Sequence, residues 1–281
     1  MKSILEVLNL GTEYLSKRNI PDARINMQEL MCDILGVQKI DLYLNFDKPL
    51  DESEIDTIRT KMTELAAHKP IQYVINSAQF LSLCLDLNNN VLIPRPETEE
   101  LTKKILNLKQ NRDNEFNVLD IGTGSGCIAI SIAENFRQWK VYAIDNSAEA
   151  IETASSNAQK YNLDNIYFYR MDILKQIPKT QFDIIISNPP YIPLNEYKDL
   201  DKNVLNYEPK AALTDNSDGL TFYRRFAEIF PKMLKPQGKF YLEIGYGQSE
   251  AIEEIFSVTN FDVKVSKDLN GINRFIEGVA K

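Results

Sequence analysis

From residue 117 onward the chain alternates between short apolar runs and longer amphipathic segments, and this alternation limits the possible folds more than any other feature. Strands alternating with helices predict a mostly parallel sheet covered on both faces, which is an α/β fold. Two final strand candidates, 261–268 and 273–280, predict an antiparallel edge. The other strands are expected at 117–121, 140–145, 166–170, 182–187 and 239–245, and helices from about 94 to Lys109, from Ser125, over 148–161 and over 219–234.

The first 70 residues predict a small helical bundle. Apolar side chains recur at helical spacing over 21–36, and Gly36 follows as a stop signal. Asp51 and Glu54 have the spacing of a capping box at the start of a second helix. The segments "IQYVI" and "AQFLSLCLDL" suggest a hairpin around Asn76. We therefore expect a helical domain at 1–70, a hairpin linker at 71–93 and an α/β domain at 94–281.

Composition excludes several classes of function. A net charge of -8 disfavours broad nucleic-acid binding, and a single histidine, His68, disfavours a histidine metal cluster or a Ser-His-Asp site. The cysteines, Cys32, Cys84 and Cys127, are widely spaced, so we expect small buried side chains without a disulfide or a metal. No apolar run has membrane-spanning length, and acidic residues come too early for a signal peptide. A cytoplasmic location is expected.

A glycine-rich turn, "DIGTGSG", joins the strand at 117–121 to the next helix. Its residues Gly122, Thr123, Gly124, Ser125 and Gly126 allow a tight turn and let a ligand approach the backbone. A structural turn without a ligand is the alternative. Asp120, which lies two residues before the first glycine, would repel a pyrophosphate and suits a cationic amino-acid group instead. A dinucleotide is therefore disfavoured.

Two further strand ends complete a predicted cofactor pocket. Asp145 is placed to accept hydrogen bonds from both hydroxyls of a ribose, although it could serve only as an acidic residue at a helix start. Asp172 could take an adenine amino group and Ile173 could cover the ring; a solvated turn aspartate beside a core isoleucine is the alternative. Taken together, these features predict a pocket for S-adenosylmethionine.

The strand at 182–187 ends abruptly at "SNPPY". In a doubly wound sheet this strand should flank the strand at 117–121, which would bring Asn188 beside the glycine turn. Pro189 and Pro190 stiffen the backbone, so Asn188 and a neighbouring carbonyl could hold the two hydrogens of a planar NH2 group. Tyr191 would stack on that group. These residues predict methyl transfer to an amide or amino nitrogen, and an Asn-Pro turn with a core tyrosine is the structural alternative.

Several separated motifs resemble one family. The strand-end motif resembles those of class I S-adenosylmethionine-dependent amino-methyltransferases, which have a Rossmann-like, mostly parallel seven-stranded sheet. The segments "LIPRPETEEL", "KPIQYVINSAQF", "SNPPYI", "YEPKAAL" and "LEIGYGQ" resemble the PrmC/HemK family, protein-(glutamine-N5) methyltransferases of class I peptide-chain release factors. One departure is Asn76, where the family usually has glycine; asparagine also tolerates a left-handed turn.

The resemblance implies a function in translation termination. It implies methyl transfer from S-adenosylmethionine to the glutamine of the release factor's Gly-Gly-Gln motif, with the N-terminal domain recognising the substrate. It assigns Asn188 and Pro189 to catalysis, Asn188 to Tyr191 to the glutamine amide, and the glycine turn, Asp145, Ile173 and Asn188 to the cofactor. Arg95 and Glu208 lie in family motifs without an assigned role. We expect a monomer that binds neither nucleic acid stably nor membranes.

Three other functions compete with this one. A nucleic-acid amino-methyltransferase, acting on adenine N6 or guanine N2, would share the chemistry but should carry a basic surface. A non-catalytic S-adenosylmethionine-binding or scaffold protein would not need the "SNPPY" acceptor loop. A nicotinamide-dependent dehydrogenase is disfavoured by the charge of Asp120.

Overall fold

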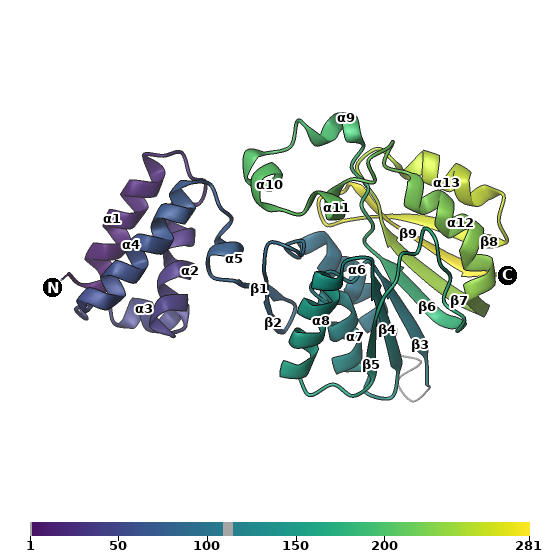
Figure 1. Cartoon of the computed structure of the whole chain (residues 1–281), viewed down its shortest axis with the longest axis horizontal. Coiled ribbons are helices and arrows are strands. Elements are labelled where there is room, and N and C mark those ends of the chain that lie inside the picture. Colours follow the sequence, from purple (N-terminus) through teal and green to yellow (C-terminus); the bar gives the residue numbers. More distant parts are fainter. Residues whose placement is uncertain (1, 109–114) are drawn as a thin grey trace. The chain divides into compact units, whose positions relative to one another are not determined.

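The computed structural model describes residues 2–108 and 115–281. It divides into two compact units, Met1–Ser77 with Asp201–Tyr207, and Ala78–Leu200 with Glu208–Lys281 (Figure 1). The predicted helix end at Lys109 lies outside the described residues. No helix in the described ranges is long and apolar enough to span a membrane. The predicted functional domains, with boundaries at residues 70 and 93, stay predictions.

The first unit is the expected bundle of helices. Its elements are α1 (Ile4–Ser16), α2 (Ala23–Leu35), α3 (Lys39–Leu44), α4 (Glu52–Ala66), α5 (Ile71–Val74) and α10 (Lys202–Tyr207). The predicted capping box is present, because Glu54 N donates to Asp51 Oδ1 at 2.8 Å and Asp51 N donates to Glu54 Oε2 at 2.8 Å. Gly36 ends α2 in the left-handed region, as its position predicted. One apolar core holds the unit together.

The hairpin differs from the sequence-based prediction. Residues 71–74 form helix α5 instead of a strand, and the hairpin is β1 (Ser77–Phe80) with β2 (Leu83–Asp86). Ile71 and Val74 are buried in the helical core, so tertiary packing overrides their preference for strands. Asn76 is not at the hairpin turn; it joins α5 to β1 with φ 54°, a left-handed conformation that asparagine tolerates.

The second unit contains the predicted sheet. Its strands are β3 (Asn117–Ile121), β4 (Lys140–Asp145), β5 (Ile166–Arg170), β6 (Phe182–Ser187), β7 (Leu234–Glu243), β8 (Phe261–Lys267) and β9 (Asn273–Ala280). The order is β5-β4-β3-β6-β7-β9-β8, and all neighbours are parallel except those of β9. The antiparallel edge and the pairing of β6 with β3 are thus confirmed. β7 begins earlier than expected, directly after the preceding helix.

Helices cover both faces of this sheet (Figure 1). One core lies between the sheet and α6 (Pro96–Leu106), α7 (Cys127–Asn135) and α8 (Ala148–Lys160), and a second lies under α12 (Thr221–Met233) and α13 (Ser249–Ser257). Two short helices, α9 (Leu194–Tyr197) and α11 (Lys210–Leu213), lie in the long segment between β6 and α12. The arrangement leaves the carboxyl ends of β3, β4 and β6 together at one edge of the sheet.

The cysteine prediction is right for Cys127, which is buried, and wrong for Cys84, which is exposed; Cys32 is half-buried. The reason is the alternation of β2, where Leu83 and Leu85 face the core and the residues between and after them face outward. His68 is exposed just after the end of α4.

Candidate active site

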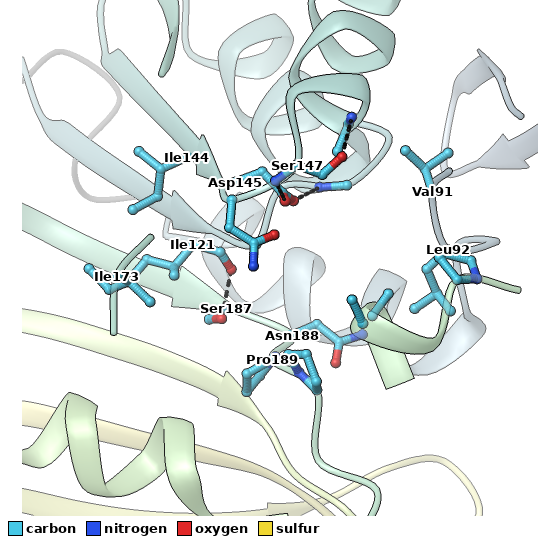
Figure 2. Close-up of a pocket in the computed structure, with 18 of the residues that line it drawn as sticks. Val91, Leu92, Ile121, Ile144, Asp145, Ser147, Ile173, Ser187, Asn188 and Pro189 are labelled. Atoms are coloured by element: carbon cyan, nitrogen blue, oxygen red, sulfur yellow. Dashed lines mark hydrogen bonds between the residues drawn. The ribbon is translucent and has the colours of Figure 1, made fainter. Parts of the chain in front are cut away.

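A pocket of about 280 Å³ lies at the carboxyl ends of β3, β4 and β6. Of the predicted site residues, eight line it: Gly122, Gly124, Asp145, Asp172, Ile173, Asn188, Pro189 and Pro190. Figure 2 shows Asp145 and Asn188 on opposite sides of this space, with Ile121, Ile144 and Ile173 at one end. The position agrees with the rule that ligands bind where the strand order of an open α/β sheet reverses.

The glycine turn leaves its backbone open to the pocket. Gly122 and Gly124 have φ of 75° and 55°, which a residue with a side chain rarely adopts. A Cβ atom at Gly122 would meet no atom closer than the Asn188 carbonyl oxygen at 3.9 Å, and one at Gly124 would meet none within 4 Å. Gly126 has a different role, because a Cβ there would lie 2.8 Å from Ile130 and 3.1 Å from Ala154.

Asp145 ends β4 and is tied to the glycine turn. Its Oδ2 accepts a hydrogen bond from Gly124 N at 3.0 Å, and its Oδ1 accepts one from Ser147 N at 3.0 Å. Burial raises the pKa of this carboxyl, while these backbone donors lower it. A carboxylate has about four acceptor sites, so capacity remains for hydroxyls of a ligand.

Asp172 and Ile173 follow β5 at the apolar end of the pocket. Ile173 is 4% exposed and contributes apolar surface. Asp172 accepts from Leu174 N at 3.1 Å and pairs with Lys175 at 2.8 Å, and this lysine lowers the pKa of the Asp172 carboxyl. Asp172 therefore stabilises its own turn and also lines the pocket.

Asp120 lies beneath the glycine turn and is fully buried. Its Oδ2 accepts from Thr123 Oγ1 at 2.7 Å, whereas no partner in the described residues reaches its Oδ1. The pKa of this carboxyl is raised to about 7, mainly by burial and to a smaller extent by Asp145, while the hydrogen bond from Thr123 lowers it. A buried carboxylate oxygen without a partner is costly, and Asp120 does not line the pocket, so its predicted role toward a cationic ligand group stays a prediction.

Asn188 stands at the end of β6 with its amide oriented by a neighbour. Asn188 Nδ2 donates to Thr98 Oγ1 of α6 at 3.0 Å. The preceding Ser187 is anchored as well, since its hydroxyl donates to Ile121 O at 2.7 Å. Pro189 and Pro190 follow in the pocket wall. The strand end is therefore held on both sides of Asn188, and the space in front of the glycine turn is open.

Four other predicted residues and Asp120 are not part of the pocket wall. Thr123, Ser125 and Gly126 are buried in the turn. Tyr191 lies behind Asn188, with its hydroxyl donating to Glu243 Oε1 at 3.2 Å and its carbonyl accepting from Gln248 Nε2 at 2.8 Å. Their roles toward cofactor and substrate stay predictions.

The sequence reasoning missed part of the pocket. Glu149, in the first turn of α8, lines the pocket and was missed. Much of the other missed wall comes from Asn90, Val91 and Leu92 before α6, from Pro209, Ala211 and Ala212 around α11, and from Phe222 of α12. These residues carry no charge and have no regular spacing, so no chemical pattern identifies them. Thr98 and Glu243 were also missed, although both stand in motifs that were recognised, "RPETEE" and "LEIGYGQ".

Arg95 and Glu208, which had no assigned role, bind each other. Arg95 Nη2 lies 2.6 Å from Glu208 Oε1 and 2.7 Å from Oε2, and the glutamate side chain is only 2% exposed. The next residue, Pro209, belongs to the pocket wall. The ion pair thus holds one wall of the pocket against the start of α6.

Comparisons with known proteins show which fold class the second unit belongs to. Residues 112–271 match a family model described as a methyltransferase domain, and residues 6–75 match the PrmC N-terminal domain. The crystal structure of a methyltransferase from Pyrococcus furiosus has the same fold, with a TM-score of 0.53 at 20% identity over 78% of this chain and 98% of that one. The second unit is therefore a class I methyltransferase fold.

Comparison with curated relatives shows which family of methyltransferases the chain belongs to. The release factor glutamine methyltransferase of Streptococcus pneumoniae is 44% identical over 227 residues, which is 80% of each chain. That of Leptospira interrogans is 37% identical over 278 residues, 98% of this chain and 97% of the relative. The chain belongs to the family of release factor glutamine methyltransferases.

Proposed function

We propose that the protein transfers a methyl group from S-adenosylmethionine to the side-chain amide nitrogen of the glutamine in the Gly-Gly-Gln motif of class I release factors. The observation that carries this proposal is the position of Asn188, which directly follows β6 and lines the same pocket as Gly122 and Gly124 of the glycine turn. Family membership gives the substrate class its independent support.

The residues of the pocket fit the cofactor. Asp145 offers acceptors for ribose hydroxyls, and Ile173 and its apolar neighbours cover a flat ring. When bound, S-adenosylmethionine supplies an electrophilic methyl carbon. In the described part of the chain, no three His, Cys, Asp or Glu side chains gather as a metal site would require.

Asn188 and Pro189 form what we call the acceptor corner, the pair of oxygens that would hold the substrate amide. The nitrogen of that amide is a weak nucleophile. An amide nitrogen shares its lone pair with the carbonyl, so attack places positive charge on its N-H bonds. Asn188 Oδ1 and the backbone carbonyl of Pro189 would accept those two hydrogens and stabilise the growing charge. Because the prolines restrict the backbone, little reorganisation is needed as the charge develops. The amide proton then leaves to water.

The test is transfer of labelled methyl to purified class I release factor. We expect label on the wild-type factor and none on a factor whose motif glutamine is replaced by alanine. DNA and RNA serve as alternative acceptors in parallel reactions. Label on nucleic acid, with none on the factor, would overturn the proposal in favour of a nucleic-acid amino-methyltransferase. A monomeric, cytoplasmic enzyme stays a prediction.

A further inference from the structure

Behind Asn188 lies a buried chain of hydrogen bonds from parts of the sequence that are far apart. Asn188 Nδ2 donates to Thr98 Oγ1 at 3.0 Å, and Thr98 Oγ1 donates to Glu243 Oε2 at 2.7 Å. The other carboxylate oxygen, Oε1, accepts from Tyr191 Oη at 3.2 Å. Thr98 and Glu243 are 3% and 1% exposed, so water does not compete for the bond between them.

The direction of each hydrogen bond in this chain follows from the charge on Glu243. An ionised carboxylate can only accept, so the single hydroxyl hydrogen of Thr98 must go to Glu243. Thr98 Oγ1 is then left as an acceptor, and only the NH2 end of the Asn188 amide can satisfy it. A flipped amide would set two oxygens 3.0 Å apart with no hydrogen between them.

We propose that Thr98 and Glu243 are positioning residues that fix the orientation of the Asn188 amide, so that its oxygen and not its NH2 group faces the substrate. This inference rests on the proposed function and deepens it. An oxygen at this place accepts hydrogen from a planar NH2 group, which selects carboxamide substrates. An NH2 group at the same place would instead suit a carbonyl or carboxylate.

Tyr191 strengthens the same arrangement from the other side. Its hydroxyl occupies the second carboxylate oxygen of Glu243, and burial raises the pKa of Tyr191 well above its usual value, so it remains a donor. Glu243 thus receives two hydroxyl donors and has no need to donate. The tyrosine of the "NPPY" motif therefore has a second role besides the predicted stacking, since it helps set the direction of the hydrogen-bond chain.

The orientation depends on the protonation state of Glu243. The pKa of Glu243 is raised to about 7; burial is the main cause and Glu97 adds to it, while Thr98, Tyr191 and Arg274 offset part of the rise. A protonated Glu243 could donate to Thr98, and Thr98 could then donate to the oxygen of Asn188, which reverses the amide. The ionisable groups that act on or beside Glu243 are Glu97, Cys127, Tyr191, Tyr223 and Arg274.

The first test compares three threonine variants in the release-factor methylation assay. Thr98→Val removes the hydroxyl and keeps the shape, and Thr98→Ser restores the hydroxyl. Thr102→Val is the matched control, because Thr102 is buried one turn further along α6 and donates only to Thr98 O at 2.8 Å. We expect Thr98→Val to lower kcat about tenfold or more with KM and cofactor affinity unchanged, since the half-buried Asn188 amide loses the partner that orients it. Thr98→Ser and Thr102→Val should stay within about threefold of the wild type.

The second test does not depend on activity. With asparagine labelled by ¹⁵N, the side-chain NH2 of Asn188 should exchange slowly with solvent in the wild type and in Thr98→Ser, and quickly in Thr98→Val. Equal kcat in Thr98→Val and Thr102→Val, or equal exchange in Thr98→Val and wild type, would overturn the proposal. Slow exchange in a wild-type enzyme that transfers no methyl would refute the proposed function and leave the positioning intact.

Discussion

Replacing Glu243 by glutamine should stabilise the fold at high pH. The folded-state pKa of Glu243 is raised from 4.5 to about 7 by burial, so folding favours the neutral carboxyl. The shift of about 2.5 units corresponds to roughly 3 kcal/mol, at about 1.4 kcal/mol per unit. The sign follows from linkage: this contribution is fully present below pH 4.5 and is lost as the pH rises through 7.

Urea unfolding of the wild type and Glu243→Gln across pH 4 to 8.5 measures this difference. Relative to the glutamine variant, the wild type should lose up to roughly 3 kcal/mol of unfolding free energy between about pH 4.5 and 7.5. Glu253→Gln, an exposed change on α13, is the control and should run parallel to the wild type. Parallel curves for Glu243→Gln and wild type would refute the view that this carboxylate is ionised at a cost in stability.

Three further predictions concern single interactions. Wild-type methyl transfer should fall as the pH drops below about 7, because protonation of Glu243 releases the amide of Asn188, and Glu243→Gln should be slower but lack this limb; a pH-rate profile measures both. Asp145→Ala should weaken binding of S-adenosylmethionine about tenfold or more by calorimetry on the folded variant, and unchanged affinity would contradict the ribose assignment. Gly126→Ala should destabilise the fold by about 1–3 kcal/mol in denaturant unfolding, because the added carbon meets Ile130 at 2.8 Å in a left-handed backbone, whereas a neutral result would show that α7 can shift.

Much of the fold was predictable because the spacing of apolar residues along the chain indicates which segments are buried in the sheet and which helices cover it. The strands at 117–121, 140–145 and 182–187 were found at their observed bounds, since each is a short, mostly apolar segment flanked by loop residues. The segment 71–74 failed because its β-branched residues face a helical core that local sequence does not show. The secondary structure of such a segment is set by its packing in the folded chain and not by its intrinsic propensity.

Some residues of the site could also be predicted from the sequence, and others could not. Asp145 and Asn188 were identifiable because they stand at strand ends, where a charged or amide group after an apolar run has few structural uses. Thr98 and Glu243 were not, since their roles come from a contact across 145 residues of sequence. Arg95 and Glu208 pair across 113 residues for the same reason. A motif shows that such residues matter locally, whereas their partners become visible only in the folded chain.

Single-turnover methyl transfer by Asn188→Ala tests the acceptor corner most directly. With saturating cofactor and release factor, the rate of the chemical step should fall about a hundredfold or more, as expected when one preorganised partner of the developing charge is lost. The variant should still fold and bind the cofactor, and saturating cofactor removes any difference in affinity from the measured rate. A rate within about threefold of the wild type, with the protein folded and loaded, would contradict the account and place the acceptor of the amide hydrogens elsewhere.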